Sequence, residues 1–192
     1  MHGDLPDLLL RQYRPDTDIH YPLSRQASIK DILEAVGIPH TEIGAIGKET
    51  RQLDFNYLPG PGEKLDIYPV PSGTAALQPS LLRPDPPTEI RFLVDINVAR
   101  LAGLLRMAGF DTVSTGEAEN VPTKREIAQQ STRSGRIILS RDKELLKHRE
   151  VAFGRLVRTQ EPKAQLYEIV SFYGLQSDLV PFSRCLRCLS LI

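Results

Sequence analysis

The chain has 192 residues, of which 41% are hydrophobic and 25% are charged, and its formal net charge is zero. This composition is ordinary for a soluble globular protein and excludes a disordered tail, a collagen and a coiled coil. No run approaches the roughly 18 apolar residues that cross a bilayer, and the N-terminus lacks the basic and then apolar plan of a secretion signal. We therefore expect a cytoplasmic protein with no membrane partner.

The N-terminal part of the chain is acidic and the C-terminal part is basic, and a proline-rich segment lies between them. Residues 1–72 carry 7 Lys and Arg against 11 Asp and Glu, whereas residues 90–192 carry 16 against 11. Eight of the fifteen prolines fall between Pro59 and Pro87, and proline disfavours both helices and central strands. We predict a domain at residues 1–71, a proline-rich linker at 72–89 and a second domain from residue 90. The basic domain is the candidate for binding a polyanion.

The first domain is predicted to contain one helix among short strands. Apolar residues at 29, 32, 33 and 36 share a helical face, Ser28 and Asp31 form a capping-box-like start, and Gly37 ends the helix. Strand candidates lie at 19–23, 43–46 and 64–68. One helix beside short strands indicates a small α+β domain of the β-grasp type.

In the second domain, apolar runs alternate with amphipathic segments. Because the strand candidates are continuously apolar, they favour a parallel sheet with helices on both faces, which is an α/β fold. The predicted strands lie at 90–94, 110–113, 136–139 and around 156–157, and the predicted helices at 98–108, 123–132 and 165–173.

Acidic residues follow two of these strands within three positions. Asp95 follows the first strand and Asp142 follows the third. Parallel sheets bind ligands at the carboxyl ends of their strands, so Asp95, Asp142 and Glu144 converge if both strands are central and adjacent. Carboxylates there could hold one or two divalent cations that activate water and stabilise charge at a phosphate. The alternative is that Asp95 and Asp142 cap the helices that follow them.

Basic side chains in the second domain are candidates for contacts with the phosphates of a nucleic acid. The alternative interpretation is a solvated helical surface, which is where most Lys and Arg residues lie. The candidates include Arg100, Arg106, Arg141 and Lys143.

Several strings of the second domain resemble, in order and spacing, the Mut-seven C-terminal ribonuclease family, which is a PIN-like group. They include Phe92-Leu93-Val94-Asp95, Arg136-Ile137-Ile138-Leu139-Ser140-Arg141-Asp142 and Pro181-Phe182-Ser183-Arg184-Cys185-Leu186-Arg187-Cys188. The first domain resembles the ubiquitin-like domain that often precedes this ribonuclease. Its matching strings include Ser28-Ile29-Lys30-Asp31, Val36-Gly37-Ile38-Pro39 and Asp66-Ile67-Tyr68-Pro69.

The resemblance implies a PIN-like ribonuclease domain at residues 90–180 that follows a ubiquitin-like domain at 1–71. It also implies cleavage of RNA, with single-stranded RNA favoured, and Mg²⁺ or Mn²⁺ as the cofactor. Asp95 and Asp142 stand at the matching positions for the catalytic metal ligands, with Asn97 and Glu144 as neighbours.

The sequence departs from the family pattern at the helix before Arg136. Where the family commonly has an acidic residue, this chain has Thr123-Lys124-Arg125-Glu126. A lysine close to the metal would oppose cation binding. The missing carboxylate could come from Glu117, Glu119 or Glu126, and we include Glu119 among the expected metal ligands. The alternative function is a catalytically impaired RNA-binding or protein-interaction module descended from a PIN-like nuclease.

Two further features concern zinc and a protein partner. Cys185 and Cys188 are spaced like half of a Zn²⁺ site, and the resemblance places them in a partial zinc-ribbon-like tail at 181–192. A histidine such as His148 could complete the shell, two chains could share one zinc, or the cysteines are reduced and unliganded. The ubiquitin-like domain continues into Pro69-Val70-Pro71 instead of a free Gly-Gly, so we expect a protein interaction or regulatory role.

Overall fold

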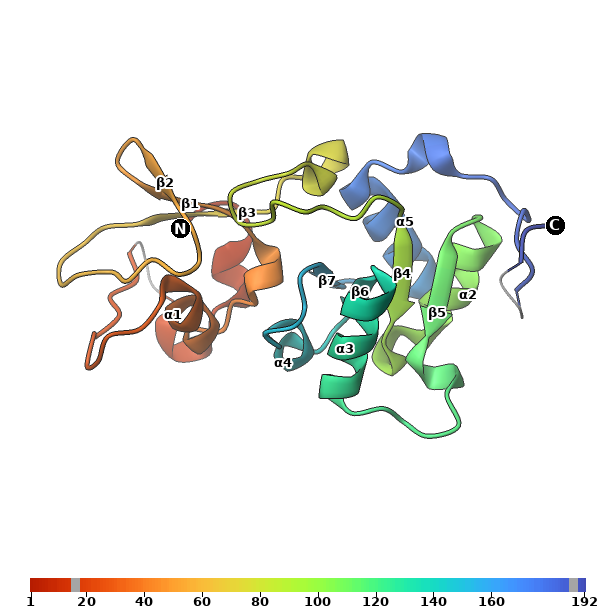
Figure 1. Ribbon diagram of the computed structural model, residues 1–192, viewed down its shortest axis with the longest axis horizontal. Helices are drawn as coiled ribbons and strands as arrows, with labels where there is room; N and C mark the ends of the chain where they lie inside the picture. Colours follow the sequence, from red (N-terminus) through yellow and green to blue (C-terminus); the bar gives the residue numbers. More distant parts are fainter. Residues whose placement is uncertain (15–17, 187–189) are drawn as a thin grey trace. The chain divides into compact units, whose positions relative to one another are not determined.

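The computed structural model describes residues 1–14, 18–186 and 190–192. Its contacts divide the chain into two compact units (Figure 1). The first unit comprises Met1–Pro71 and Pro79–Asp85, and the second comprises Ser72–Gln78 and Pro86–Ile192. The proline-rich segment therefore contributes residues to both units. Its first part forms the 3-10 helix Gly73–Leu77, which contacts helix α5 (Pro162–Tyr173) of the second unit.

The first unit is a three-stranded antiparallel sheet with one α-helix, α1. The strand order is β2-β1-β3, and the bounds are Ile29–Ala35 for α1, Ile43–Lys48 for β1, Arg51–Leu53 for β2 and Asp66–Pro69 for β3. The predicted helix is confirmed, and the hydroxyl of Ser28 accepts the backbone N–H of Asp31 as its cap. This small α+β unit agrees with the predicted ubiquitin-like class.

One predicted strand of the first unit is absent, and part of the proline-rich segment is bonded to this unit. The predicted strand at 19–23 does not form; this segment makes no pairing with a strand, and Pro22 lacks the N–H that a ladder needs. In the proline-rich segment, the Arg83 guanidinium donates hydrogen bonds to the carbonyls of His40, Thr41 and Ile43 at 2.9, 3.0 and 2.7 Å. These bonds attach part of that segment to the first unit.

The second unit contains a four-stranded parallel sheet in the order β5-β4-β6-β7. Its strands are Arg91–Val94 (β4), Asp111–Ser114 (β5), Ile137–Ser140 (β6) and Gly154–Leu156 (β7). The apolar strands β4 and β6 are central and almost wholly buried, because helices cover both of their faces. This confirms the predicted α/β class.

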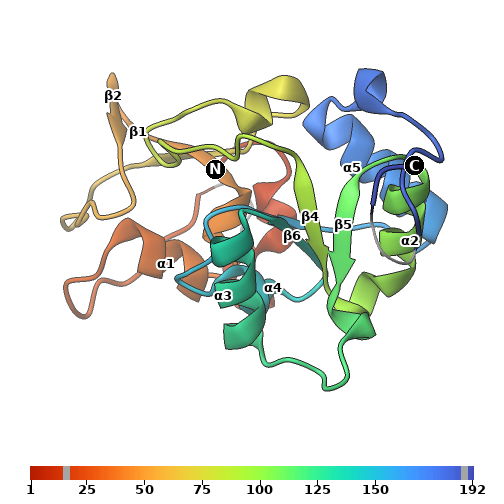
Figure 2. The same ribbon diagram turned by 45° about the vertical axis from the view of Figure 1, so that its right-hand side comes forward.

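The helices of the second unit form two groups on opposite faces of the sheet (Figures 1 and 2). Helix α2 (Ala99–Met107) contacts α5, whereas α3 (Lys124–Ser134) contacts the short helix α4 (Lys143–Leu146). Throughout the described ranges, no helix has both the length and the apolar character needed to span a membrane. The arrangement leaves the carboxyl ends of β4 and β6 beside the start of α3, and this is where the candidate site lies.

Candidate active site

The site lies where the connections of the parallel sheet diverge. From β4 the chain crosses to β5 on one side, and it later returns to β6 on the other side of β4. Such a switch point leaves a crevice at the carboxyl ends of the two central strands. Val94 and Leu139 pair in the sheet, so the acids that follow them, Asp95 and Asp142, reach the same pocket. The structure thus brings these two predicted residues together.

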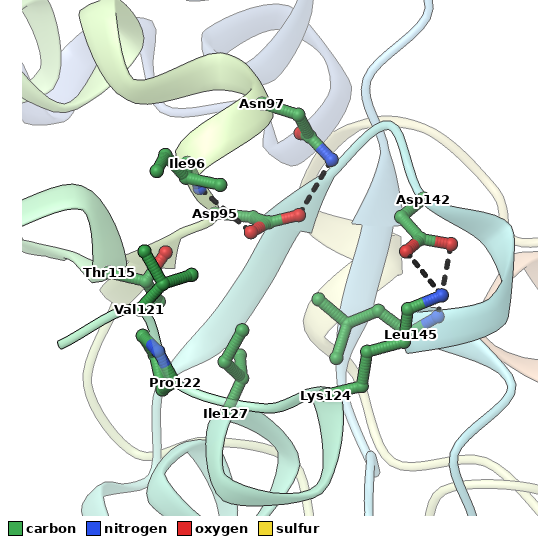
Figure 3. A pocket seen from close by; sticks show the side chains of 10 residues that line it. All are labelled: Asp95, Ile96, Asn97, Thr115, Val121, Pro122, Lys124, Ile127, Asp142 and Leu145. Atoms are coloured by element: carbon green, nitrogen blue, oxygen red, sulfur yellow. Dashed lines mark hydrogen bonds and ion pairs between the residues drawn. The ribbon is translucent and has the colours of Figure 1, made fainter.

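The pocket has a volume of about 210 Å³ and two kinds of wall (Figure 3). Its apolar wall includes Ile127 from α3 and Leu145 from α4. The polar side chains that line it are Asp95, Asn97, Thr115, Lys124 and Asp142. Side chains from four different segments therefore converge on a small volume that carries both charged and apolar groups.

Asp95 is held in a network of short hydrogen bonds. Its Oδ1 accepts the backbone N–H of Ile96 at 2.7 Å, and its Oδ2 accepts from the Asn97 amide and the Ser140 hydroxyl, each at 2.6 Å. The residue is only 6% exposed. Since bonds to an ionised acceptor are strong, this network fixes the carboxylate at the end of β4. Asp95 also caps the 3-10 helix Ile96–Val98, but it does not cap the following helix α2 as the alternative interpretation expected, because the N-cap of α2 is Val98.

Asp142 caps helix α4 and simultaneously lines the pocket. Its Oδ1 accepts the backbone N–H groups of Glu144 and Leu145 at 2.9 and 3.4 Å, which confirms the expected cap. Its own N–H donates to the Ser140 hydroxyl at 2.9 Å. Ser140 therefore links the two acids, because the same hydroxyl donates to Asp95.

Lys124 supplies the positive charge of the site. Its Nζ lies 2.7 Å from Asp142 Oδ2, and Figure 3 shows the lysine side chain reaching from the start of α3 to that carboxylate. Burial acts to raise the pKa of Asp142, but the bond to Lys124 and the amides of Glu144 and Leu145 outweigh it and hold the pKa below its usual value. Asp142 is therefore an ionised, paired carboxylate at neutral pH.

The other acids considered as metal ligands lie outside the pocket lining. Glu117 forms a two-bond ion pair with Arg106, and Glu126 accepts the N–H and hydroxyl of Thr123 in the capping box of α3. Glu144 pairs with Lys147 at 2.7 Å, and Glu119 is exposed in the segment before α3. Residues 1–14, 18–186 and 190–192 contain no group of three or more His, Cys, Asp or Glu side chains placed to hold a metal ion.

The predicted RNA-binding residues fall into two groups. Arg100 and Arg141 are exposed, Lys143 is half-buried, and Arg141 donates its backbone N–H to Asn97 Oδ1 at 3.0 Å. Arg106 is only 5% exposed, and its guanidinium bonds to Glu117 and to the carbonyl of Thr112. The Arg106 guanidinium therefore stabilises the contact between α2 and β5, and Arg106 does not line the pocket.

The proposed zinc half-site is described for one of its two cysteines. Cys185 is half-buried, and its backbone N–H donates to the carbonyl of Ser190 at 2.9 Å. It forms no disulfide in the described part of the chain. Cys188 lies outside the described residues.

Two polar residues of the site were not singled out from the sequence. Ser140 is fully buried and bridges Asp95 and Asp142; the available signal was a polar residue that ends an otherwise apolar strand. Thr115 follows β5 and lines the pocket, and its Oγ1 is buried with no hydrogen-bond partner among the described residues. No comparable sequence signal marks Thr115.

Two family models match segments that together cover almost the whole chain. Residues 90–192 match the family model described as the Mut7-C RNAse domain, and residues 1–74 match the one described as Mut7-C ubiquitin. No curated protein and no solved structure gives a significant match to the chain.

Proposed function

Because the chain belongs to the Mut7-C RNAse domain family, we propose that it hydrolyses RNA phosphodiester bonds at the pocket between β4 and β6, with a divalent cation held by Asp95 and Asp142. The observation that carries this proposal is the convergence of both carboxylates on one pocket at the carboxyl ends of adjacent parallel strands. That position is where open α/β sheets bind their ligands.

The donor chemistry of the pocket fits one Mg²⁺ or Mn²⁺ ion. Mg²⁺ is usually bound by one or two carboxylates, with water and substrate phosphates as its other ligands. An ionised carboxylate has about four lone-pair sites. Three of these accept hydrogen bonds at Asp95, and Asp142 Oδ2 receives only the Lys124 ammonium among the contacts described above. Two lining carboxylates favour a one-ion site over a two-ion site.

The side chains around this position are preorganised for the reaction. A bound divalent cation would supply a nucleophilic water at neutral pH and offset charge on the phosphate. Ser140, Asn97 and the N–H of Ile96 hold Asp95, while the first turn of α4 holds Asp142, so neither carboxylate needs to reorganise.

We assign contacts with the RNA backbone to Arg100, Arg141 and Lys143. Arg100 and Arg141 present their charge on the surface, and Arg141 and Lys143 flank Asp142 in the sequence. We do not include Arg106, because its guanidinium is buried against Glu117. We propose single-stranded RNA as the substrate, as the resemblance implies.

The test is cleavage of an end-labelled, mixed-sequence single-stranded RNA by the full chain with Mn²⁺, Mg²⁺ or EDTA. Asp95→Asn and Asp142→Asn should each abolish metal-dependent cleavage. Asp178→Asn is the matched control, because Asp178 is an exposed acid of the same unit that follows α5. Circular dichroism verifies that every variant is folded. Wild-type rates in both site variants would refute the assignment.

One observation favours a second candidate function, an RNA-binding module without turnover. Lys124 neutralises Asp142 across the pocket at 2.7 Å, and this ion pair opposes cation binding at the same oxygen. Such a module would bind the RNA with strong salt dependence and would leave it intact with either metal. The cleavage assay, combined with a binding measurement at low and high salt, separates the two functions.

A further inference from the structure

We propose that Lys124 couples RNA binding to metal binding: its ammonium occupies the cation position on Asp142 in the free protein, and an RNA phosphate draws it away. This inference rests on the proposed function, and it assigns to Lys124 the phosphate group of the substrate as its ligand. The family commonly has an acidic residue at the start of helix α3, and this chain has Lys124 there instead. The proposal gives that difference a function.

The backbone of Lys124 is fixed, whereas its side chain is free to change partner. Lys124 is the first residue of α3, whose start is secured by reciprocal hydrogen bonds between Thr123 and Glu126. The lysine side chain is 53% exposed and the Asp142 side chain is 30% exposed. A lysine carries a compact charge on a flexible stem, so its ammonium can leave Asp142 without any movement of the helix.

The ammonium and a divalent cation compete for the same carboxylate. Lys124 Nζ lies 2.7 Å from Asp142 Oδ2, so a cation bound to that oxygen would lie close to the lysine charge. Repulsion between a single and a double positive charge about 4 Å apart corresponds, even in bulk water, to a factor of about 30 in affinity. Rotation of the exposed side chain relieves part of this repulsion, and we expect a net effect of about tenfold.

A phosphodiester offers the ammonium an alternative anionic partner. Lysine binds phosphate oxygens as a point charge, and Lys124 lines the pocket in which the scissile phosphate is proposed to lie. Asp142 does not depend on Lys124 for its position, because the N–H groups of Glu144 and Leu145 hold its other oxygen. Transfer of the ammonium to phosphate therefore frees Asp142 Oδ2 in place. By thermodynamic linkage, RNA and metal then strengthen each other's binding by the same factor.

The test measures Mn²⁺ affinity of the full chain by the electron paramagnetic resonance signal of free Mn²⁺, so it requires no catalysis. Lys124→Gln keeps a long polar side chain and removes the charge, and it should bind Mn²⁺ about tenfold more tightly than the wild type. The matched control is Arg125→Gln, which removes one charge from the next, exposed position of α3 and should leave the affinity unchanged. Adding Asp142→Asn to Lys124→Gln should abolish the gain.

A second arm adds a saturating single-stranded RNA oligonucleotide and records the signal while gel analysis shows the RNA to be intact, because blocking the 2′-hydroxyl groups would not stop hydrolysis by a metal-activated water. The oligonucleotide should raise the Mn²⁺ affinity of the wild type about tenfold and have a much smaller effect on Lys124→Gln. Equal Mn²⁺ affinities of wild type and Lys124→Gln, or an equal effect of RNA on both, would overturn the inference. If the wild type still cleaves RNA with Mn²⁺, that result leaves the proposed function standing; absence of both Mn²⁺ binding and cleavage in every variant overturns both.

Discussion

Replacement of Ser140 by alanine tests whether the hydroxyl joining the two acids holds the site together. Ser140 is fully buried, and its hydroxyl donates to Asp95 Oδ2 at 2.6 Å while it accepts the N–H of Asp142 at 2.9 Å. The bond to the carboxylate contributes about 2 kcal/mol, and the N–H left without its acceptor costs about 1 kcal/mol more. Ser140→Ala should therefore lower the free energy of unfolding by about 3 kcal/mol.

The assay is urea unfolding followed by far-ultraviolet circular dichroism, because the chain contains no tryptophan to report fluorescence. Ser131→Ala is the matched control: Ser131 is also buried in the second unit, but its hydroxyl donates one bond, to the neutral carbonyl of Arg136 at 2.6 Å. That loss should cost about 1 kcal/mol. A cost for Ser140→Ala no larger than the cost for Ser131→Ala would refute the proposed role of the hydroxyl.

Three further predictions concern charges. The folded-state pKa of Asp142 is lowered, so its carboxylate contributes stability that is present above about pH 4 and is lost as the pH falls through the lowered pKa. Urea unfolding at a series of pH values measures this contribution. The difference in free energy of unfolding between wild type and Asp142→Asn should shrink below about pH 4. Glu117→Gln should lower the free energy of unfolding by about 1–2 kcal/mol in the urea assay, because it removes the charge that pairs with buried Arg106, with the effect reduced because Glu117 is half-exposed. Arg83→Ala removes three hydrogen bonds to main-chain carbonyls of the first unit and should cost about 2–3 kcal/mol, measured as faster amide hydrogen exchange in β1. Unchanged pH dependence, stability or exchange, respectively, would contradict these expectations.

The second unit could be predicted well from the sequence because its pattern is strong and local. The apolar runs at β4 and β6 are continuous, since both faces of these strands are buried, and the helix predicted at 123–132 corresponds to α3. The capping box of Thr123 and Glu126 was not identified from the sequence. The first unit was predicted less completely. Strand β2 is only three residues long with two exposed positions, so it leaves almost no pattern. The segment 19–23 has an apolar pattern but no strand partner, and pairing is not encoded locally.

Some residues of the candidate site could be predicted from the sequence, and others could not. Asp95 and Asp142 were predictable because each follows an apolar strand, and the topology of parallel sheets brings such ends together. The ion pair between Lys124 and Asp142 could not be predicted as a contact. It depends on where α3 begins relative to the end of β6, which is a matter of tertiary packing. The same reason applies to Ser140, whose role requires β4 and β6 to be neighbours.

The most direct test of the central claim is the ratio of Mn²⁺-dependent RNA cleavage rates of the wild type and Asp95→Asn under single-turnover conditions. Asp95 is the acid most firmly fixed in the pocket, and asparagine preserves its size while removing its charge. Loss of a group that stabilises charge in a transition state typically costs at least about a hundredfold in rate. We predict that the wild type cleaves the RNA only with metal and that Asp95→Asn is slower by at least about a hundredfold. Cleavage by folded Asp95→Asn within about threefold of the wild-type rate, below any effect expected for such a group, would contradict the account.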